Sequence, residues 1–265
     1  MKRPFFSIIV VSLNAENLIR KTIDSVLNQN FNDYEIIVKD AVSSDNTLAQ
    51  IPKDDRIHIY SEKDSGIYDG MNQAISYSSG KYLIFLNCGD FFATDSVLSH
   101  VYETAKELDD NNSIIYGDYQ RNSIKAKQPS GLSDFYLYRT PLCHQTVFFG
   151  SGVLKKLSNY NTEYKILADY DLTLRCYRAN VEFVYCPYVI SDYLGGGVSE
   201  SEKGRVLRAK EYKQIRDSYF SKQKQKYYDF KLALSLKGFR QKLASDKSPK
   251  LIRKIYRGLV NLVNR

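Results

Sequence analysis

The sequence predicts an α/β fold with a mostly parallel central sheet flanked by helices, followed by a basic helical tail. Three observations carry this prediction. Short strand-like runs alternate with segments of helical periodicity through the first half of the 265 residues. The runs are apolar throughout, which is typical of parallel strands buried on both faces. Polar residues follow several of the runs, at the edge where open parallel sheets bind their ligands.

The first half contains four predicted strands and two predicted helices between them. The strands are the runs Phe6–Leu13, Glu35–Lys39, Arg56–Tyr60 and Tyr82–Leu86. The first helix has apolar residues at helical spacing, namely Leu18, Ile19, Ile23, Val26 and Leu27. The second helix opens at about Ser65 and carries on one face Ile67, Met71, Ala74 and Ile75. A loop and a short helix are expected from Ala41 onward.

The second half is less regular. Its predicted helices and strands are Val97–Leu108 and Ala168–Arg178, and Ser113–Asp118, Thr146–Phe149 and Glu182–Cys186. The segment Lys125–Arg139, which contains Pro129 and Gly131, is predicted as a loop region. Three consecutive glycines at 195–197 suit a turn that folds over a ligand.

Charge divides the chain at about residue 200. Residues 1–199 contain 19 Lys/Arg and 24 Asp/Glu, a net charge of −5, whereas residues 200–265 contain 19 and 6, a net charge of +13. We therefore predict a catalytic domain at 1–199 and a basic tail at 200–265 that meets a polyanion, either nucleic acid or an anionic membrane. A solvated helical surface is the simpler alternative for such charges.

The last segment of the tail has the periodicity of an amphipathic helix. The lysines and arginines of this segment lie outside its apolar stripe. The stripe consists of Leu251, Ile252, Ile255, Tyr256, Leu259, Val260 and Val263. Such a helix suits a membrane surface with anionic headgroups. A helix packed on the protein's own core has the same periodicity, so both interpretations stay open.

Neither membrane spans nor a metal-binding cysteine pattern is predicted. No stretch approaches the roughly 20 apolar residues that cross a bilayer. The start, MKRPFFSIIVVSLN, lacks a small-residue cleavage site and runs into charged residues, so we interpret it as a buried strand. The cysteines have no C-x-x-C spacing and no matching histidines, and free thiols in a cytosolic protein are expected for Cys88, Cys143, Cys176 and Cys186.

Polar residues converge on the carboxyl edge of the predicted sheet. Ser12 and Asn14 follow the first strand, Asp40 follows the second, and Asn87–Asp90 follow the fourth. Asp90 could give one carboxylate contact to a metal ion that is bound to a pyrophosphate, while Asn87 could add a weaker neutral contact to the ion. An aspartate after a glycine is, by itself, more often a turn residue.

The start of the second helix is a candidate anion site. Asp64 and Ser65 precede this helix, whose free N–H groups and dipole would attract an anion. Ser65 as a helix cap is the simpler interpretation.

Four further side chains are considered for proton transfer or ligand contact. Asp169 and Asp171 point in different directions on a predicted helix. One of them, facing the edge, would take a proton from an attacking hydroxyl, and the other would pair with Arg175 in a surface salt bridge. A lone histidine is more often structural, but His144 and Gln145 lie on a predicted loop between two candidate regions, which favours contact with an acceptor or a diphosphate.

A series of ordered motifs resembles one known family. The motifs are SIIVVSLNAE, EIIVKDAVSSDNT, EKDSGIYDGMNQAI, GKYLIFLNCGD, HQTVFF, LADYDLTLR and GGGVS. In order and spacing they resemble the family 2 glycosyltransferases of the GT-A fold over about residues 5–199. This resemblance implies a single nucleotide-sugar-binding α/β domain that transfers a sugar from a nucleotide-diphosphate donor with inversion. It also implies Mn²⁺ or Mg²⁺ as a cofactor.

The resemblance assigns donor-site roles by position. Asn14 and Glu16 match the end of the first strand near the nucleotide. Asp40 matches the carboxylate that contacts the base, and Asp45 lies beside it in an S-x-D-x-T element. The other residues that the resemblance places at the donor or acceptor are Ser12, Asp64, Gly66, Tyr68, Asp69, Asn72, Asn87 and Gly89.

The resemblance also assigns the metal ligand and the base, with departures from the family pattern. Asp90 matches the last acid of the metal-binding D-x-D motif, whose first acid is replaced by Asn87. Asp169 matches the general base of an E-D pair, whose preceding acid is replaced by Ala168. Met71 stands where many members have an arginine, so the pyrophosphate charge would be met by the helix start, the metal, Lys63 or His144.

The GIYDGMN and LNCGD variants resemble the branch that builds bacterial O-antigen, capsule or exopolysaccharide units. This resemblance implies a UDP-sugar donor, a polyprenyl-diphosphate-linked sugar acceptor, and a cytoplasmic protein at the inner face of the cell membrane. The tail would then contact anionic lipid, and no nucleic-acid partner is expected.

Two other classes of protein are alternatives, and each would have different sequence features. A nucleotidyltransferase would normally have a glycine-rich basic phosphate loop where this chain has SLNAEN. A nucleic-acid-binding protein could stack bases on the tail aromatics Tyr212, Tyr219, Phe220, Tyr227 and Tyr228. The acidic first 199 residues oppose a nucleic-acid partner.

Overall fold

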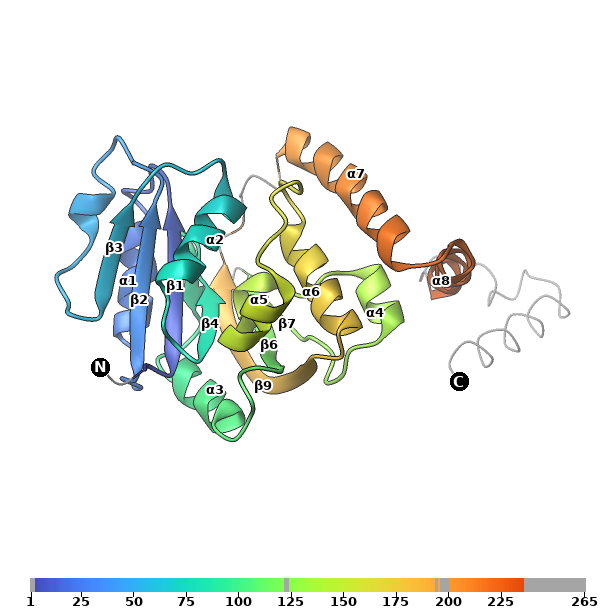
Figure 1. The fold of residues 1–265 in the computed structure, drawn as a ribbon, viewed down its shortest axis with the longest axis horizontal. Helices are drawn as coiled ribbons and strands as arrows, with labels where there is room; N and C mark the ends of the chain where they lie inside the picture. Colours follow the sequence, from blue (N-terminus) through green and yellow to red (C-terminus); the bar gives the residue numbers. More distant parts are fainter. Residues whose placement is uncertain (1–2, 122–123, 194, 196–200, 236–265) are drawn as a thin grey trace, which may run out of the picture. The chain divides into compact units, whose positions relative to one another are not determined.

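The structure, a computed structural model, describes residues 3–121, 124–193, 195 and 201–235 (Figure 1). The predicted closing loop at 195–199, apart from Gly195, and the apolar stripe at 251–263 lie outside the described residues. The chain divides into two compact units. The first comprises residues 1–133 and 141–212, and the second comprises residues 134–140 and 213–265. The division falls inside a helix, after the predicted boundary at residue 199.

The first unit is built on one sheet, with the strand order β3-β2-β1-β4-β8-β6-β9-β5. Its first four strands are parallel, namely β3 (Ile57–Ser61), β2 (Tyr34–Asp40), β1 (Phe6–Ser12) and β4 (Tyr82–Phe85). Every residue of β1 and β2 is buried, as expected for central parallel strands. Since parallel strands end at the same edge, Ser12 of β1 lies beside Asp40 of β2.

The remaining strands make the rest of the sheet mixed. β8 (Val147–Gly150) is antiparallel to β4 and to β6 (Ser113–Arg121). β9 (Glu182–Tyr193) is parallel to β6, whereas β5 (Asp90–Phe92) is antiparallel to β9 and β7 (Ile124–Ala126) is antiparallel to β6. This arrangement confirms the predicted α/β fold class.

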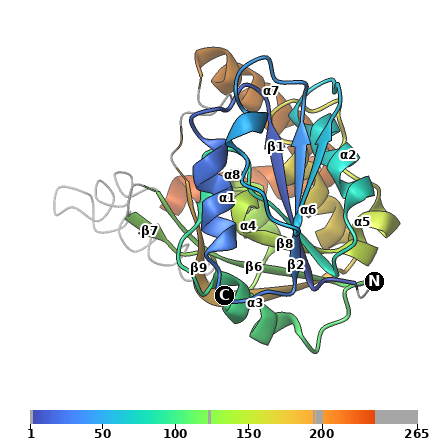
Figure 2. The ribbon, with the colours of Figure 1, turned by 90° about the vertical axis from the view of Figure 1, so that its left-hand side faces the viewer.

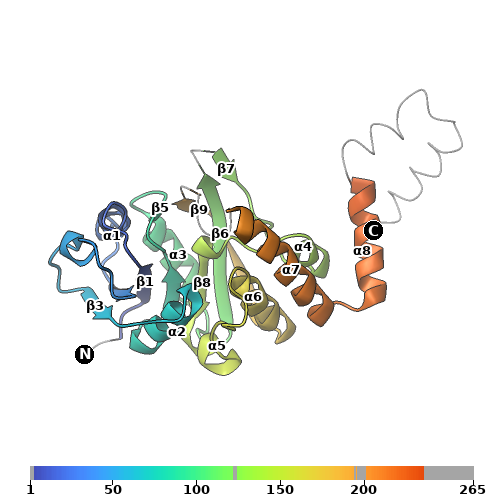
Figure 3. The same ribbon diagram turned by 90° about the horizontal axis from the view of Figure 1, so that it is seen from above.

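Helices cover both faces of the parallel strands. α1 (Ile19–Leu27) and α2 (Ile67–Tyr77) lie on opposite faces (Figures 2 and 3). The other helices of this unit are α3 (Val97–Ala105), α5 (Ser151–Leu157), α6 (Ala168–Arg178), the part of α7 (Glu202–Tyr219) up to Tyr212, and the 3-10 turns η1 (Leu48–Gln50) and η2 (His144–Thr146).

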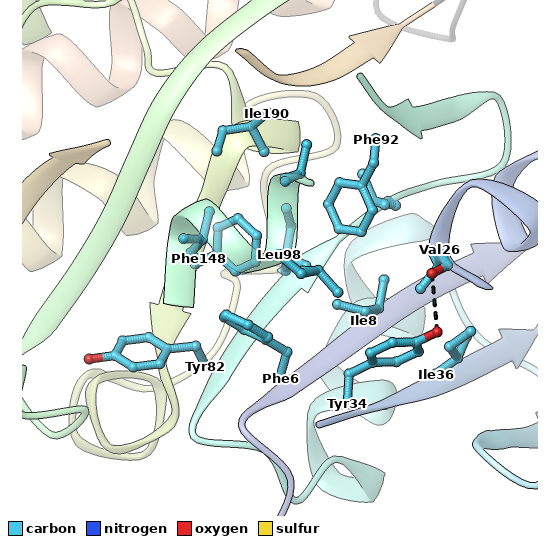
Figure 4. Close-up of a cluster of buried hydrophobic side chains, with 14 of the residues drawn as sticks. Phe6, Ile8, Val26, Tyr34, Ile36, Tyr82, Phe92, Leu98, Phe148 and Ile190 are labelled. Carbon is cyan, nitrogen blue, oxygen red and sulfur yellow. Dashed lines mark hydrogen bonds between the residues drawn. The ribbon is translucent and has the colours of Figure 1, made fainter. Parts of the chain in front are cut away.

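The core between α1, α3 and the sheet holds the strand order in place (Figure 4). Phe6 of β1 packs edge-to-face on Phe148 of β8, with ring centroids 5.4 Å apart. Tyr34 of β2 is buried, and its hydroxyl donates to the Val26 carbonyl at 3.1 Å, so the polar end of this ring is satisfied. Each such side chain contributes about 1.5–3 kcal/mol through burial. The core thereby fixes the edge at which the strands end.

Three predicted segments differ from the structure. α2 begins at Ile67 and not at Ser65, and Gly66 at its start has a φ of 136° and gives no side-chain cap. The loop prediction for Lys125–Arg139 is wrong in part, since the segment contains the end of β7 and α4 (Asp134–Arg139), whose Leu137 and Tyr138 are buried. β9 continues to Tyr193 because its pairing with β6 resumes after a bulge.

The second unit is a small helical cluster with aromatic packing. It contains α4, the end of α7 and α8 (Lys222–Ser235). Tyr138 of α4 lies 5.2 Å, ring to ring, from both Phe220 and Tyr228. The Arg216 guanidinium lies over the Tyr138 ring at 4.1 Å, and it also donates to the Tyr138 carbonyl. Tertiary packing of aromatic rings therefore makes α4 a helix where the sequence pattern favours a loop.

Two composition-based expectations can be compared with the described residues. None of their helices is long and apolar enough to cross a membrane. All four cysteines are free thiols, as predicted.

Candidate active site

A tight turn after β4 brings Asn87 and Asp90 to the carboxyl edge of the sheet. The Asp90 N–H donates to the Asn87 carbonyl at 2.9 Å. Gly89 inside the turn has a φ of 100°, which strongly favours glycine, and its N–H donates to the Thr22 hydroxyl of α1 at 3.0 Å. The turn is therefore fixed to α1, and β5 begins at Asp90 in a defined position.

The η2 turn faces this edge and presents His144 and Gln145. The predicted loop is thus a 3-10 turn at these residues. Gln145 Nε2 lies 3.5 Å from Asp90 Oδ1, and Asn87 Nδ2 lies 3.3 Å from His144 Nε2. The two predicted ligand-contacting residues therefore lie directly against the predicted metal-binding turn.

Buried Gln128 holds the η2 turn from behind. Its side-chain oxygen accepts the Cys143 N–H at 3.0 Å, and its Nε2 donates to the Thr146 hydroxyl at 2.8 Å. Its own backbone N–H donates to Asp118 Oδ1 at 2.9 Å. One amide side chain thus contacts the residues on both sides of His144 and Gln145.

Asp169 reaches the same place from the first turn of α6. Its Oδ1 lies 3.2 Å from the Tyr68 hydroxyl, which also donates to the Ile166 carbonyl at 2.8 Å. Its Oδ2 lies 3.7 Å from His144 Nδ1, and the side chains of both residues remain partly exposed. Contacts therefore connect residues from α2, the turn after β4, η2 and α6, namely Tyr68, Asn87, Asp90, His144, Gln145 and Asp169.

Asp171 has a different surrounding. Its Oδ2 accepts from Arg175 Nε at 2.9 Å, as predicted, but its side chain is only 7% exposed. The same guanidinium donates to the backbone carbonyls of Ser158 and Asn159. The predicted surface salt bridge is therefore a largely buried one, because Arg175 fastens the segment between α5 and α6 to the helix.

Asp90 is electrostatically unusual. Burial raises its pKa to about 6, and the opposing influence of His144 and of the Gln145 hydrogen bond limits this rise. Asn87 Oδ1 nearby is buried and has no hydrogen-bond partner among the described residues. The turn thus brings together a buried carboxylate and a buried amide oxygen that no described residue engages.

The side-chain oxygens of Asp90 and Asn87 are a possible site for a divalent cation. The described residues contain no group of three or more His, Cys, Asp or Glu side chains that could hold a metal ion. A cation at this turn would therefore have Asp90 and Asn87 as its protein ligands and would complete its shell with ligand and water oxygens. Hard oxygen donors in small number are the kind of set that Mg²⁺ and Mn²⁺ accept.

Asp40, at the end of β2, is buried and fully engaged. Its carboxylate accepts hydrogen bonds from the Ser12 hydroxyl at 3.1 Å, the Ser61 hydroxyl at 3.0 Å and the Ser43 N–H at 2.8 Å. Burial alone would raise the pKa of Asp40, but the hydrogen bonds from Ser43, Ser61 and Ser12 outweigh it and lower the pKa.

The other residues predicted to lie near the nucleotide tie two loops together. Asn14 Oδ1 accepts the Ser44 N–H at 2.9 Å, and Glu16 Oε2 accepts the Asn46 N–H at 3.0 Å. The Glu16 N–H in turn donates to Asp45 Oδ2 at 3.1 Å. The loops after β1 and β2 are therefore held as one wall at the carboxyl edge.

The start of α2 already carries its own carboxylates. The Gly66 N–H donates to Asp64 Oδ1 at 3.1 Å, and the Ser65 N–H donates to Asp69 Oδ2 at 2.8 Å. Asp64 Oδ2 also lies 3.3 Å from the Nζ of Lys39, whose side chain is fully buried. These two N–H groups are therefore engaged by carboxylates of the same segment, and the anion-binding role of this helix start stays a prediction.

Gly66 and Asn72 also have defined surroundings. A Cβ added at Gly66 would meet no atom within 4 Å, so the start of α2 borders open space. Asn72 uses both ends of its amide on the backbone of Tyr160, with two hydrogen bonds of 2.9 Å. This contact gives Asn72 a structural role between α2 and the segment before α6.

The sequence analysis missed three residues that support the site. Thr22 and Gln128 each fix one of its turns, and Lys39 holds the strand that leads to α2 by donating to the Glu62 carbonyl at 2.6 Å. Their partners belong to other elements, so no local pattern indicates them. A lysine directly after the apolar residues Ile36–Val38 of β2 was the one available signal.

Comparison with known proteins adds sequence relatives. A profile described as Glycosyl transferase family 2 matches residues 7–161. A PGL/p-HBAD biosynthesis glycosyltransferase of Mycobacterium bovis is 31% identical over 210 residues, which cover 76% of this chain and 81% of that protein. A chondroitin synthase of Pasteurella multocida is 26% identical over 188 residues, which cover 65% of this chain and 19% of that protein.

Solved structures with the same arrangement of elements also exist. The mannosyltransferase PcManGT from Pyrobaculum calidifontis, in complex with GDP-Man and Mn²⁺, has a TM-score of 0.64 at 16% identity and covers 100% of this chain and 82% of that chain. S. aureus TarS 1-349 in complex with UDP-GlcNAc has a TM-score of 0.63 at 16% identity and covers 81% and 71%. At this identity the likeness shows a shared fold.

Proposed function

The chain belongs to the family 2 glycosyltransferases, and from this premise we propose that it transfers a hexosyl or N-acetylhexosaminyl group, with inversion, to a hydroxyl of a glycan acceptor. The donor is a nucleotide-diphosphate sugar. One observation carries the proposal: the contacts from Asp90 through Gln145 and His144 to Asp169 put a buried carboxylate and a partly exposed one on either side of one turn.

Asp169 is the proposed general base. Its carboxylate is held by the Tyr68 hydroxyl and faces His144, yet it stays accessible to an acceptor. As the acceptor hydroxyl attacks the anomeric carbon, its proton passes to Asp169 and the bond to the diphosphate breaks. Attack from the face opposite the leaving group inverts the anomeric centre.

Asp90 and Asn87 are the proposed metal ligands. When bound, Mn²⁺ or Mg²⁺ would neutralise charge on the leaving diphosphate. Gln145 orients the Asp90 carboxylate from the η2 turn, and His144 is placed to donate to a diphosphate or acceptor oxygen. The replacement of the usual first acid by Asn87 makes the ion dependent on donor phosphates for the rest of its shell.

The joined loops after β1 and β2 are the proposed wall for the nucleotide. Ser12, Asn14, Glu16 and Asp45 keep that wall in shape, and Asp40 at its base is the proposed contact for the nucleobase. Because hydrogen-bond donors already surround Asp40, base recognition there requires one of the serine hydroxyls to turn away. UDP is the preferred nucleotide of the proposal.

The second unit supports an acceptor at a membrane surface. On α8, Tyr227 is 47% exposed and Phe230 is 46% exposed, and Phe230 lies one helical turn after both Tyr227 and exposed Lys226. Aromatic rings beside a cation suit the interface of an anionic bilayer. We therefore propose a polyprenyl-diphosphate-linked sugar as acceptor, presented at the inner face of the cell membrane.

A nucleotide-release screen tests the proposal. Purified full-length protein is given UDP-, GDP- and dTDP-sugars with Mn²⁺ or Mg²⁺ and a synthetic lipid-diphosphate-sugar acceptor. We expect acceptor-dependent release of UDP, an inverted product by NMR, and loss of activity on addition of EDTA. No release from any donor would favour the nucleotidyltransferase or nucleic-acid-binding alternatives.

A further inference from the structure

Glu211 of α7 is a buried carboxylate bound to the backbone segment that leads into α6. Its residue is 2% exposed. Oε1 accepts the Lys165 N–H at 2.7 Å, and Oε2 accepts the Ile166 N–H at 3.0 Å and the Leu167 N–H at 2.9 Å. One side chain, 44 to 46 residues away in the sequence, thus accepts three consecutive backbone N–H groups.

These N–H groups lie at the start of α6. The residue at the N-cap position of α6 is Leu167, which offers no side-chain cap of its own. Uncapped N–H groups and the positive end of the helix dipole favour a carboxylate at this place. Glu211 accepts from Leu167 and from the two residues before it, so it fixes the backbone that leads into α6.

The segment 165–167, which Glu211 binds, is also part of the site. The Ile166 carbonyl accepts the Tyr68 hydroxyl at 2.8 Å, and the same hydroxyl lies 3.2 Å from Asp169 Oδ1. Only Ala168 lies between Leu167, whose N–H Glu211 binds, and Asp169. A shift of this segment would displace the carboxylate and its hydroxyl partner together.

A second contact ties the same two helices together. The ring of Tyr170, which follows Asp169, stacks on the ring of Tyr212, which follows Glu211, with centroids 5.0 Å apart and an interplanar angle of 28°. Figures 1 and 3 show α6 and this part of α7 side by side. The first part of α7 therefore contacts both the start of α6 and its first turn.

We infer that Glu211 is a positioning residue for Asp169, so that the first part of the basic tail belongs to the catalytic apparatus. The inference rests on the proposed role of Asp169 as the base. It assigns a task to a glutamate that touches neither donor nor acceptor. Its removal should slow the chemical step while leaving the donor site intact, because the donor residues belong to other elements.

Glu211→Ala and Glu211→Gln in the full-length protein test this role. Misplacing a catalytic group by about 1 Å costs roughly 100-fold in rate, so we expect kcat of Glu211→Ala to fall by about 10- to 100-fold. The donor KM should stay within about threefold, since a loss made only in the transition state lowers kcat and kcat/KM together. Glu211→Gln keeps one acceptor oxygen and should recover part of the activity.

Glu202→Ala is the matched control, because Glu202 is an exposed glutamate in the first turn of the same helix. It should leave kcat and KM at the wild-type values. A water-soluble acceptor keeps membrane binding out of the comparison. Hydrogen exchange gives a readout besides activity: the N–H groups of residues 165–167 should exchange faster in Glu211→Ala, while those of β1 and β2 should not change.

The outcomes separate this inference from the proposed function. If the wild type releases nucleotide and Glu211→Ala matches it in kcat, or shows unchanged exchange at 165–167, the positioning role is wrong. A fall in kcat accompanied by an equal rise in donor KM and faster exchange in β1 and β2 would show a merely structural role and would also overturn it. A wild type that is inactive with every donor would overturn the proposed function itself.

Discussion

At the scale of single residues, two aspartates in the first turn of α6 receive different roles from their partners. Asp169 meets a hydroxyl and an imidazole and stays partly exposed, whereas Asp171 is 7% exposed and paired with Arg175. A carboxylate that must accept a proton from a substrate needs access, and one that fastens a guanidinium does not. Substituting each aspartate in turn therefore compares the effect on turnover with the effect on the stability of the fold.

Asp169→Asn should abolish most of the activity without unfolding the protein. The amide has the same shape but cannot serve as a base, so kcat should fall by about 100- to 10,000-fold. Donor KM and the melting temperature should stay close to the wild-type values, as measured by nucleotide release and thermal unfolding. Near-normal turnover in a folded variant would remove Asp169 from the mechanism.

Asp171→Asn is the companion variant. It leaves a largely buried guanidinium without its carboxylate, which should destabilise the protein by about 3 kcal/mol. Its kcat should remain within about threefold of wild type below the melting temperature, because Asp171 does not face the reacting groups.

Asp40 should make the free energy of unfolding depend on pH. Its folded-state pKa is lowered, so its stabilising contribution is present above the pKa of the unfolded chain, about 3.9, and is lost as the pH falls through the folded-state value. Asp40→Asn removes charged hydrogen bonds and should cost about 1.5–3 kcal/mol at pH 7. The difference between wild type and variant, measured by denaturant unfolding, should shrink below pH 4. A constant difference down to pH 3 would contradict this assignment.

At the scale of elements, the site consists of short turns that buried side chains hold from behind. Thr22 fixes the turn that carries Asp90, and Gln128 fixes the η2 turn that carries His144 and Gln145. Turns leave backbone groups unpaired, and such groups need partners when they are buried. These supporting residues therefore decide where the reacting side chains stand.

Gln128→Leu tests this dependence. The substitution leaves the Cys143 N–H without its acceptor and removes the donor to the Thr146 hydroxyl, at a cost of about 1–3 kcal/mol for each buried group left unsatisfied. We expect kcat/KM to fall by about tenfold, because His144 and Gln145 would shift away from the turn that carries the proposed metal ligands. Gln128→Glu keeps the acceptor for Cys143 and should lose less activity. An equal loss in both variants would show that the Cys143 contact does not matter.

The elements show how far the sequence leads. β1, β2 and β4 are predictable because each contains a short apolar run that is buried in the sheet, namely Ile8–Val11, Ile36–Val38 and Tyr82–Phe85. α4 is not, because its helix depends on Tyr138 packing against Phe220 and Tyr228, which are distant in the sequence.

The site divides in the same way. Strand ends, helix position and family resemblance select Asp90 and Asp169 as candidates from the sequence. No such signal selects Glu211 or Gln128, because they bind the backbone of segments elsewhere in the chain. Sequence patterns report burial and local turns, whereas a contact across 44 residues leaves no periodic trace.

At the scale of the whole molecule, the basic tail has two different connections to function. Its first part, up to Tyr212, belongs to the unit that contains the sheet. Glu211 in this part accepts the Leu167 N–H just before α6. The later part of the tail belongs to a second unit, in which residues 213–235 carry six Lys/Arg and two Asp/Glu. Catalysis and membrane contact should therefore respond to different substitutions within one tail.

The double substitution Tyr227→Ala, Phe230→Ala tests the membrane part of this division. Both rings are about half exposed on α8 and should enter the interface of an anionic bilayer, so their removal should weaken flotation with phosphatidylglycerol vesicles by about tenfold. Turnover of a water-soluble acceptor should stay unchanged, since neither ring belongs to the unit that carries Asp169.

Val206→Ala is the control for exposed apolar surface, because Val206 is 70% exposed on α7 in the first unit. It should leave flotation at the wild-type level. Binding of the wild type should also weaken with salt and with neutral lipid, because the attraction between the lysines and the anionic headgroups is screened or absent there. Equal binding to neutral vesicles, or a loss with Val206→Ala as large as with the double variant, would place the membrane contact elsewhere in the chain.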